Sequence, residues 1–310
     1  MNERRVLFST PSGGGRLDHV LVDELGDLSR SRIQRLIRQG HVRVDGQAIQ
    51  KTGFKLEGGE QVEIRIPPPA PSTLVPEPLP LDIIYEDSNL LVVNKAPGMV
   101  VHPSAGHESG TMVHAVLAHA PDLRGVGEVR RPGVVHRLDK DTSGIILFAK
   151  DDATHQYLQR QFKDRTVKKT YLALVDGQPP TPTGRIEAAI GRDERNRKKM
   201  AVVPNDKGRP ATTLYKTLEQ FSGHALLEVH PLTGRTHQIR VHLAFIGCPV
   251  SGDRIYGRRN VSLPVKRQML HASQLQIMLP GETEPRVFHA PLADDFEHIL
   301  SYLRGDLLEP

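Results

Sequence analysis

The first 66 positions show the spacing of two helices followed by strands. Apolar residues recur every three or four positions in two stretches, at Leu17, Val20, Leu21 and Leu25, and at Ile33, Leu36 and Ile37. Gly40 can end the second helix. Residues 41–49 and 60–66 then alternate apolar and polar side chains, which is the period of a half-buried strand. This pattern predicts a small α/β domain.

Beyond position 80, apolar runs typical of strands are mixed with helical patterns. The strand-like runs are residues 89–96, 144–150, 170–175 and 225–232. The helical patterns are residues 111–120, 154–164 and 235–247. Hairpin-like turns separate the strands as often as helices do. The order therefore predicts an α+β domain built on a mixed, mostly antiparallel sheet.

A proline-rich segment separates these two parts of the chain. Residues 67–80 hold seven prolines, and proline lacks the N–H that a helix interior or a central strand needs. We therefore expect an extended linker. The sequence thus predicts a small domain over residues 16–66, a linker over residues 67–80 and a larger domain over residues 81–304.

The charge balance and the single cysteine narrow the class of protein. Lysine and arginine number 41 against 36 aspartate and glutamate, giving a net charge of +5, which is compatible with a polyanionic partner. Cys248 alone allows no intrachain disulfide and no cysteine-rich zinc module. No stretch approaches the ~20 apolar residues of a membrane span, and the N-terminus lacks a secretory pattern. We expect a cytoplasmic monomer with no membrane partner.

Basic side chains are concentrated in the small domain. Between residues 28 and 55 the only acid is Asp45, and the basic residues are Arg30, Arg32, Arg35, Arg38, Arg43, Lys51 and Lys55. Such residues suit contacts with phosphates, which neutralise a nucleic-acid backbone without reading its sequence. The periodicity alone is equally compatible with the solvated face of an amphipathic helix.

A polar cluster lies between two apolar runs in the middle of the chain. Residues 136–141 read HRLDKD, after Val134 and Val135 and before residues 145–148. Arg137 and Asp139 would project to the same side of an extended segment. Five ionisable groups beside a core are hard to explain by packing, so we regard this cluster as a candidate catalytic site. A hairpin whose charges only pair with one another is the alternative.

A second cluster, residues 232–247, combines a helical stripe with an arginine at its start. The stripe consists of Ile239, Leu243 and Ile246. Arg235 would lie at the helix N-terminus, where backbone N–H groups already favour an anion. It can bind a phosphate there, or a buried carboxylate such as Asp139. A surface arginine that caps the helix fits the residues nearly as well.

Together the motifs resemble two known families. Residues 16–66, with their Ser-Arg-Ser-Arg segment and their strand ending in Val-Asp-Gly, resemble the S-four-type (alpha-L) RNA-binding domain. HRLDKDTSG at 136–144 resembles the signature of the RluA-type pseudouridine synthases. Further blocks of that family follow in order, NKAPGMVVHP, KKTYLALV, GRTHQIRVH, GDRIYG and LHA. The combination of both domains is similar to the RluD branch, which acts on large-subunit ribosomal RNA.

The resemblance implies roles for four residues and a fold. Asp139 matches the catalytic aspartate, and Arg137 the arginine that fills the space left by an extruded uridine. Tyr171 matches the tyrosine that stacks on the base, and Arg235 the arginine that pairs with the aspartate. The family fold is a mixed sheet with the active cleft across its middle. Its reaction, the isomerisation of uridine to pseudouridine in RNA, needs no cofactor, and Asp139 would act either as a nucleophile or as a base.

Other functions would use the same residues in different ways. A non-catalytic RNA-binding or ribosome-assembly factor accounts for the basic small domain but not for the Asp139 and Arg235 clusters. A metal-dependent phosphoesterase would use His136, Asp139 and Asp141. No histidine pair has the spacing of a metal site on one helical face, so we expect no metal. Within the synthase reading, transfer RNA is the second candidate substrate.

Overall fold

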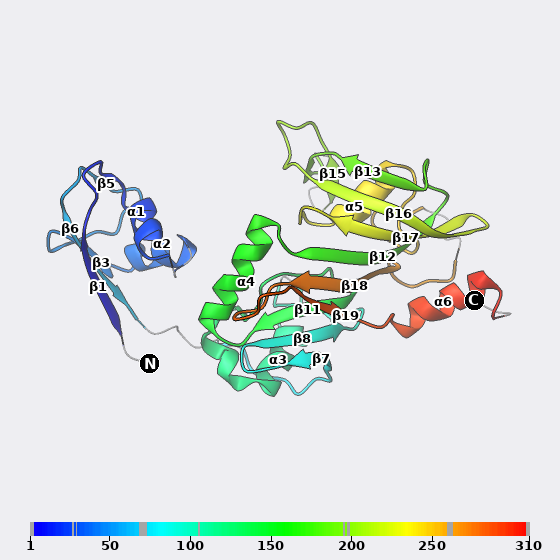
Figure 1. Ribbon diagram of the computed structural model, residues 1–310, viewed down its shortest axis with the longest axis horizontal. Helices are drawn as coiled ribbons and strands as arrows, with labels where there is room; N and C mark the ends of the chain where they lie inside the picture. The colour runs from blue at the N-terminus through cyan, green and yellow to red at the C-terminus, as the bar shows by residue number, and fades with distance from the viewer. Residues whose placement is uncertain are drawn as a thin grey trace.

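The computed structural model describes most of the 310-residue chain. It covers residues 3–26, 28, 30–67, 73–104, 106–194, 196, 199–258 and 263–307, with only the backbone of Ser31 and Arg124. Residues 68–72 of the predicted linker lie outside the described residues. The chain forms an N-terminal unit, residues 3–66, and a larger C-terminal unit that begins at residue 73 (Figure 1).

The N-terminal unit is a small sheet covered by two helices. Its described strands form a sheet in the order β1-β6-β3-β4, and β2 pairs with β5. Apolar side chains of both helices and of the strands share one core, which includes Leu21, Ile37 and Ile64. Its elements are β1 (Arg4–Ser9), β2 (Gly15–Arg16), α1 (Leu17–Glu24), α2 (Arg30–Arg38), β3 (Val42–Val44), β4 (Gln47–Ala48), β5 (Lys55–Leu56) and β6 (Gln61–Ile66).

The C-terminal unit is built on one long mixed sheet. Its described strands follow the order β13-β16-β17-β12-β18-β11-β8-β7, and β19 pairs with β18. Only the β11–β18 pair in this sheet is parallel among the described strands. The mixed, mostly antiparallel α+β fold predicted from the sequence is thereby confirmed.

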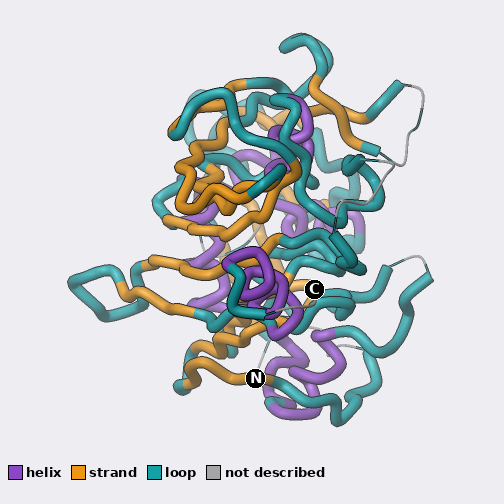
Figure 2. Tube along the Cα trace, turned by 90° about the vertical axis from the view of Figure 1, so that its right-hand side faces the viewer, coloured by secondary structure: helices purple, strands orange, loops and turns teal. Residues whose placement is uncertain are grey.

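The elements of this unit follow in chain order. They are β7 (Asp82–Glu86), β8 (Leu90–Lys95), α3 (Met112–His119), a 3-10 helix (Pro121–Gly125), β9 (Gly127–Glu128), β10 (Arg131–Pro132), β11 (Ser143–Ala149), α4 (Asp152–Asp164), β12 (Lys168–Asp176), β13 (Thr183–Glu187), β14 (Ile190–Arg192), β15 (Met200–Val202), β16 (Thr212–Phe221), β17 (His224–Pro231), α5 (Gln238–Phe245), β18 (Leu270–Ile277), β19 (Arg286–His289) and α6 (Asp294–Arg304). Figure 2 shows helices, in purple, at several levels among the strands.

The central strands are buried on both faces, which explains their continuous apolar runs. In β11, Ile146 and Phe148 pack into the core beside α3, whereas Ile145 and Leu147 pack into a second core that includes Leu158 of α4. In the other half of the sheet, apolar residues of β12 and β17 pack against α5 on one side and α6 on the other. The two halves meet at β12 and β18.

The two units approach each other at α2 and α4. Arg32 Nη1 lies 3.8 Å from Asp152 Oδ2, at the start of α4. A groove of about 690 Å³ lies between the units, and its walls include Arg35 and Gln159. In Figure 1 the N-terminal unit stands beside α4.

Gly144 is required where β11 meets β18. Its φ is +108°, and a Cβ at this position would lie 2.2 Å from the carbonyl oxygen of Ala272. We predict that Gly144→Ala lowers the free energy of unfolding by about 3 kcal/mol, through backbone strain and a forced separation of the two strands. Urea unfolding followed by circular dichroism measures this.

Gly281→Ala serves as the matched control for this prediction. Gly281 also has a positive φ, +80°, but a Cβ there would have no neighbour within 4 Å. Its replacement should cost about 1 kcal/mol, the backbone strain alone. Equal losses in the two variants would show that the contact with Ala272 does not matter.

Candidate active site

A cleft of about 490 Å³ opens at the middle of the sheet. It lies between the loop before β11, the end of α4, strand β12 and the start of α5. Among the described residues that line it, Asp139 is the only acid, and the lysines and arginines are Arg137, Lys163, Arg165, Lys169, Arg235 and Arg240. A cavity of this charge attracts a polyanion and places one carboxylate within its reach.

The loop that carries Asp139 supplies hydrogen-bond acceptors to the edge of β11 that β18 leaves unpaired. β11 pairs with β18 only at Ser143 and Gly144, whereas β8 pairs with its other side up to Ala149. The later N–H groups that point toward the β18 side therefore need other acceptors. The Ala149 N–H donates to the Gly133 carbonyl over 2.8 Å, and the Leu147 N–H donates to His136 Nε2 over 3.0 Å. The same hydrogen bonds therefore complete the strand and fix the approach to Asp139.

His136 is a structural acceptor in this arrangement. Its ring stacks on Phe162 with centroids 4.7 Å apart. Burial, and then the nearby Lys169, lower the pKa of His136 to about 3, so the ring is neutral and Nε2 stays free to accept. Among the described residues, no group of three or more potential metal ligands exists.

Three successive carbonyls hold the turn at Asp139. The Asp139 carbonyl accepts from the Thr142 N–H over 3.1 Å. The Lys140 carbonyl accepts from the buried Lys95 Nζ over 2.8 Å and from the Gly98 N–H over 3.0 Å. The Asp141 carbonyl accepts from Arg267 over 3.0 Å. The backbone of the turn is therefore fixed from β8 and from the segment that leads into β18.

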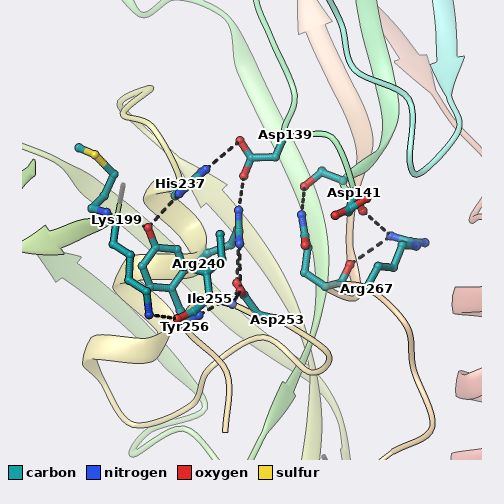
Figure 3. A network of polar contacts seen from close by, with 12 residues as sticks. Asp139, Asp141, Lys199, His237, Arg240, Asp253, Ile255, Tyr256 and Arg267 are labelled. Atoms are coloured by element: carbon teal, nitrogen blue, oxygen red, sulfur yellow. Dashed lines mark hydrogen bonds and ion pairs between the residues drawn. The ribbon is translucent and has the colours of Figure 1, made fainter. Parts of the chain in front are cut away.

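Arg240 holds the Asp139 carboxylate (Figure 3). Its Nη1 donates to Asp139 Oδ2 over 2.9 Å, while Nε and Nη2 donate to Asp253 over 2.6 and 2.9 Å. Burial opposes the charge of Arg240, but the hydrogen bonds and charge of Asp253, and then of Asp139, raise its pKa further. Arg240 is thus a permanent cation between two carboxylates.

Asp253 fixes the plane of this guanidinium. Its side chain is fully buried, and Oδ1 also accepts from the N–H groups of Ile255 and Tyr256 over 2.8 and 3.1 Å. Burial alone would raise the pKa of Asp253, but Arg240 and these N–H groups lower it. The bidentate contact leaves Nη1 of Arg240 directed at Asp139.

The structure corrects the expected partner of Asp139, because the paired arginine is Arg240 and not Arg235. Arg235 donates instead to the Pro210 carbonyl over 3.2 Å and lines the cleft. Helix α5 begins at Gln238, with His237 as its N-cap, so Arg235 precedes the helix. The partner of Asp139 is therefore the second arginine of the GRTHQIRVH block, and not the first as expected.

Arg137 and Tyr171 both line the cleft with Asp139. Arg137 is exposed. Tyr171, in β12, is half-buried and packs against the cores on either side of the cleft. Burial, and then the charge of Asp139, raise the pKa of Tyr171 well above its usual value, so the ring remains a neutral phenol.

The expected RNA-binding residues of the N-terminal unit differ in their surroundings. Arg30 donates to the buried Asp18 over 3.1 Å, and Arg32 lies near Asp152. The others are exposed, namely Arg35, Arg38, Arg43, Lys51 and Lys55. Asp18 also accepts from Arg16 and Gln34, so Arg30 contributes to the fold of the unit.

Several residues of the network were missed from the sequence. They are Lys95, His237, Arg240, Asp253, Tyr256 and Arg267. Lys95 lies in NKAPGMVVHP, His237 and Arg240 in GRTHQIRVH, and Asp253 and Tyr256 in GDRIYG. The blocks were a signal, but they gave no indication of which side chains meet.

The part of the chain that the structure describes contains no helix long and apolar enough to cross a membrane.

Each of the two units matches a known protein family. Residues 89–245 match the model of the RNA pseudouridylate synthase family, and residues 15–62 match that of the S4 domain. The ribosomal large subunit pseudouridine synthase D of Neisseria meningitidis serogroup A is 44% identical over 97% of this chain and 83% of its own length. The uncharacterized RNA pseudouridine synthase YlyB of Bacillus subtilis is 41% identical over 98% and 99%.

A solved structure shows the same similarity. Human RNA pseudouridylate synthase domain containing 4 aligns with a TM-score of 0.58 and 30% identity, covering 72% of this chain and 93% of that chain.

The ion pair between Arg240 and Asp139 can be tested by comparing variants of two arginines. We predict that Arg240→Lys lowers kcat/KM about 100-fold, because an ammonium cannot form the bidentate contact with Asp253 and still reach Asp139. Arg235→Lys keeps a cation at the cleft wall and should cost less than about tenfold. Single-turnover rates of tritium release from labelled uridine RNA give both values. A larger loss for Arg235→Lys would indicate that Arg235, and not Arg240, is the arginine on which the activity of Asp139 depends.

Proposed function

We propose that this chain, which belongs to the RNA pseudouridylate synthase family, converts specific uridines of large-subunit ribosomal RNA to pseudouridine. As a member of that family it is an isomerase that acts on RNA. The observation that carries the mechanism is a cationic cleft in which Asp139, held by Arg240, is the only acid among the described lining residues. The ribosomal target is supported by the name of the Neisseria relative, ribosomal large subunit pseudouridine synthase D, which aligns with 97% of this chain. Transfer RNA is the alternative substrate.

The division of labour follows the two units. The S4-type domain over residues 16–66 contacts RNA, the proline-rich segment over residues 67–80 links it, and residues 81–304 form the synthase domain. Ribosomal RNA is found in the cytoplasm, and we place the protein there, acting as a monomer.

The reaction needs a group that stabilises positive charge on the sugar. The N1–C1′ bond breaks, the base turns, and a C5–C1′ bond forms. The proton on C5 then leaves and N1 takes up a proton, so that the product is an isomer of the substrate. Positive charge develops on the ribose when the bond breaks, and a carboxylate can stabilise or trap it. Asp139 takes this role. Since Arg240 holds Oδ2, Oδ1 is the oxygen that remains available, whether it acts as a nucleophile or as a base.

The uridine must leave the RNA stack to reach this carboxylate. Arg137 is a long planar cation at the exposed side of the cleft, and we propose that it fills the space left by the base. The neutral ring of Tyr171 stacks on the extruded uracil. Arg235, at the cleft wall, binds a backbone phosphate. The roles of Arg137 and Tyr171 rest on position and on the similarity to the family, and the role of Arg235 rests on its position and charge.

We predict that Asp139→Asn abolishes modification without loss of folding or RNA binding. Asparagine has nearly the same shape but no negative charge, so the single-turnover rate should fall by on the order of 10⁴ or more, with little change in affinity. In cells that lack the gene, pseudouridine mapping should show unmodified positions in large-subunit ribosomal RNA. The wild-type gene should restore them, and the Asp139→Asn gene should not.

Asp141→Asn is the control for this prediction. Asp141 lies two residues further on, and its contact with Arg267 is made through the backbone carbonyl, which the substitution keeps. It should therefore restore the modification. A larger loss for Asp141→Asn than for Asp139→Asn would identify the wrong carboxylate. Unmodified positions confined to transfer RNA would move the substrate to the alternative.

The exposed cations of the N-terminal unit give a separate prediction. Replacing Arg35, Arg38 and Arg43 together by glutamine should weaken RNA binding and flatten the plot of log affinity against log salt. If all three contact phosphates, the slope should change by about 2 to 3, at ~0.7–0.9 per phosphate contact. The single-turnover rate at saturating RNA should stay normal. Filter binding at several salt concentrations measures the slope, and an unchanged slope would remove these residues from the RNA interface.

A further inference from the structure

His237 occupies a backbone conformation that a histidine rarely adopts. Its φ is +56° and its ψ is +22°, in the left-handed region, immediately before helix α5. The surrounding turn imposes this, because the Gln238 side chain accepts from the Arg235 N–H and the Thr233 hydroxyl and donates to the Thr212 carbonyl. A strained residue held by its neighbours beside a catalytic group is a candidate for a role in the reaction.

The strain places the His237 ring between Tyr256 and Asp139 (Figure 3). Nδ1 lies 2.8 Å from the Tyr256 hydroxyl, and Nε2 lies 3.8 Å from Asp139 Oδ1. Among the residues that the structure describes, the ring is therefore hydrogen-bonded at Nδ1 only. The 3.8 Å separation exceeds a hydrogen bond by somewhat less than 1 Å, so a small rotation of the carboxylate closes it.

Tyr256 selects the tautomer of His237. The Met200 N–H donates to the Tyr256 oxygen over 2.9 Å. Among the described residues the tyrosine O–H has no acceptor other than His237 Nδ1, so it donates there. A ring that accepts at Nδ1 carries its proton on Nε2, the atom that faces Asp139.

The same tyrosine also contacts the other partner of Asp139. The Arg240 guanidinium carbon lies 5.2 Å from the centroid of the Tyr256 ring, and the Tyr256 N–H donates to Asp253. One residue of the GDRIYG block therefore supports both sides of the carboxylate. Arg240 holds Oδ2, and His237 presents an N–H to Oδ1.

We propose that His237 is a positioning residue, fixed by Tyr256 in the Nε2–H tautomer, that donates a hydrogen bond to Asp139 Oδ1 during the reaction. This inference rests on the proposed function for its kinetics and on geometry alone for its tautomer. Each oxygen then accepts one hydrogen bond, and Oδ1 keeps a further lone pair for the sugar. The carboxylate is thus oriented before the glycosidic bond breaks, and the entropic cost of orientation is reduced.

The charged and titratable groups near His237 determine how it responds to pH. They are Asp139, Arg240, Asp253, Arg137 and Tyr256. Burial lowers the pKa of His237, Asp139 opposes that shift, and Arg240 adds to it. The Tyr256 O–H further favours the neutral ring by occupying the Nδ1 lone pair. Its removal should raise the pKa of His237 toward the ordinary value.

Tyr256→Phe tests the proposal in the full-length protein. It removes one hydroxyl and keeps the ring under Arg240. Long-range ¹H–¹⁵N NMR of the wild-type protein should show neutral His237 with its proton on Nε2, and the variant should show a mixture of tautomers. We expect kcat to fall about 10-fold to 100-fold, with KM for RNA within about twofold. The acidic limb of the kcat profile should move to higher pH, because a protonated ring keeps its Nε2–H but offsets the negative charge that Asp139 needs.

Tyr85→Phe is the matched control. The Tyr85 hydroxyl donates to Asp87 over 2.7 Å, and its ring lies 4.9 Å from the Arg286 guanidinium carbon, outside the cleft. It should leave kcat and the pH profile unchanged. Two variants of His237 distinguish the effect of the N–H donor from the effect of side-chain shape. His237→Gln keeps an N–H at a similar reach and should therefore retain more activity than His237→Met.

The outcomes are distinguishable. A wild-type His237 that carries its proton on Nδ1 would overturn the proposal whatever the RNA substrate, and so would a Tyr256→Phe enzyme with the kcat and pH profile of Tyr85→Phe. Equal activity of His237→Gln and His237→Met would do the same. A wild-type protein that forms pseudouridine in no RNA would refute the proposed function instead, while the NMR result would still decide the tautomer.

Discussion

The active site depends on one arginine shared by two carboxylates. Arg240 is almost fully buried, and so is Asp253, whereas Asp139 reaches the cleft. Burial of an ion pair is costly, and it is tolerated where hydrogen bonds satisfy the groups involved. Asp253 accepts two bonds from Arg240 and two from backbone N–H groups. The contacts with Asp253 thereby set the guanidinium plane, and Asp139 accepts a hydrogen bond from the remaining nitrogen, Nη1.

The sheet supplies the second constraint, because β11 leaves β18 after Gly144. The strand edge that this exposes is completed by the loop over residues 133–138. A shift of that loop would leave N–H groups of a buried strand without acceptors. The position of Asp139 is therefore tied to the integrity of the central sheet, and the carbonyls after it are held by Lys95 and Arg267.

The sequence was sufficient for most of the fold and for part of the site. Strands buried on both faces appear as continuous apolar runs, and helices α3 and α4 have a clear period, so these elements were predictable. The pairing of Asp139 was not, since Arg235 and Arg240 belong to the same block. A helix that began at Arg235 would favour that residue, but His237 takes a left-handed conformation and the helix begins at Gln238. Single-sequence periodicity does not contain such a turn, nor a contact across 101 positions.

In the proposed mechanism the carboxylate of the cleft, and not its cationic wall, favours the reacting state over the bound substrate. Phosphates of a bound RNA would meet the wall of lysines and arginines. These contacts would act before and during the reaction alike, so they would raise affinity more than rate. The proposed role of Asp139 differs, because the positive charge that it would stabilise develops on the ribose only as the glycosidic bond breaks. A group that opposes substrate binding slightly and stabilises the transition state strongly is what catalysis by differential binding requires. Arg240 serves this by holding the carboxylate in place, so that little reorganisation remains when the charge appears.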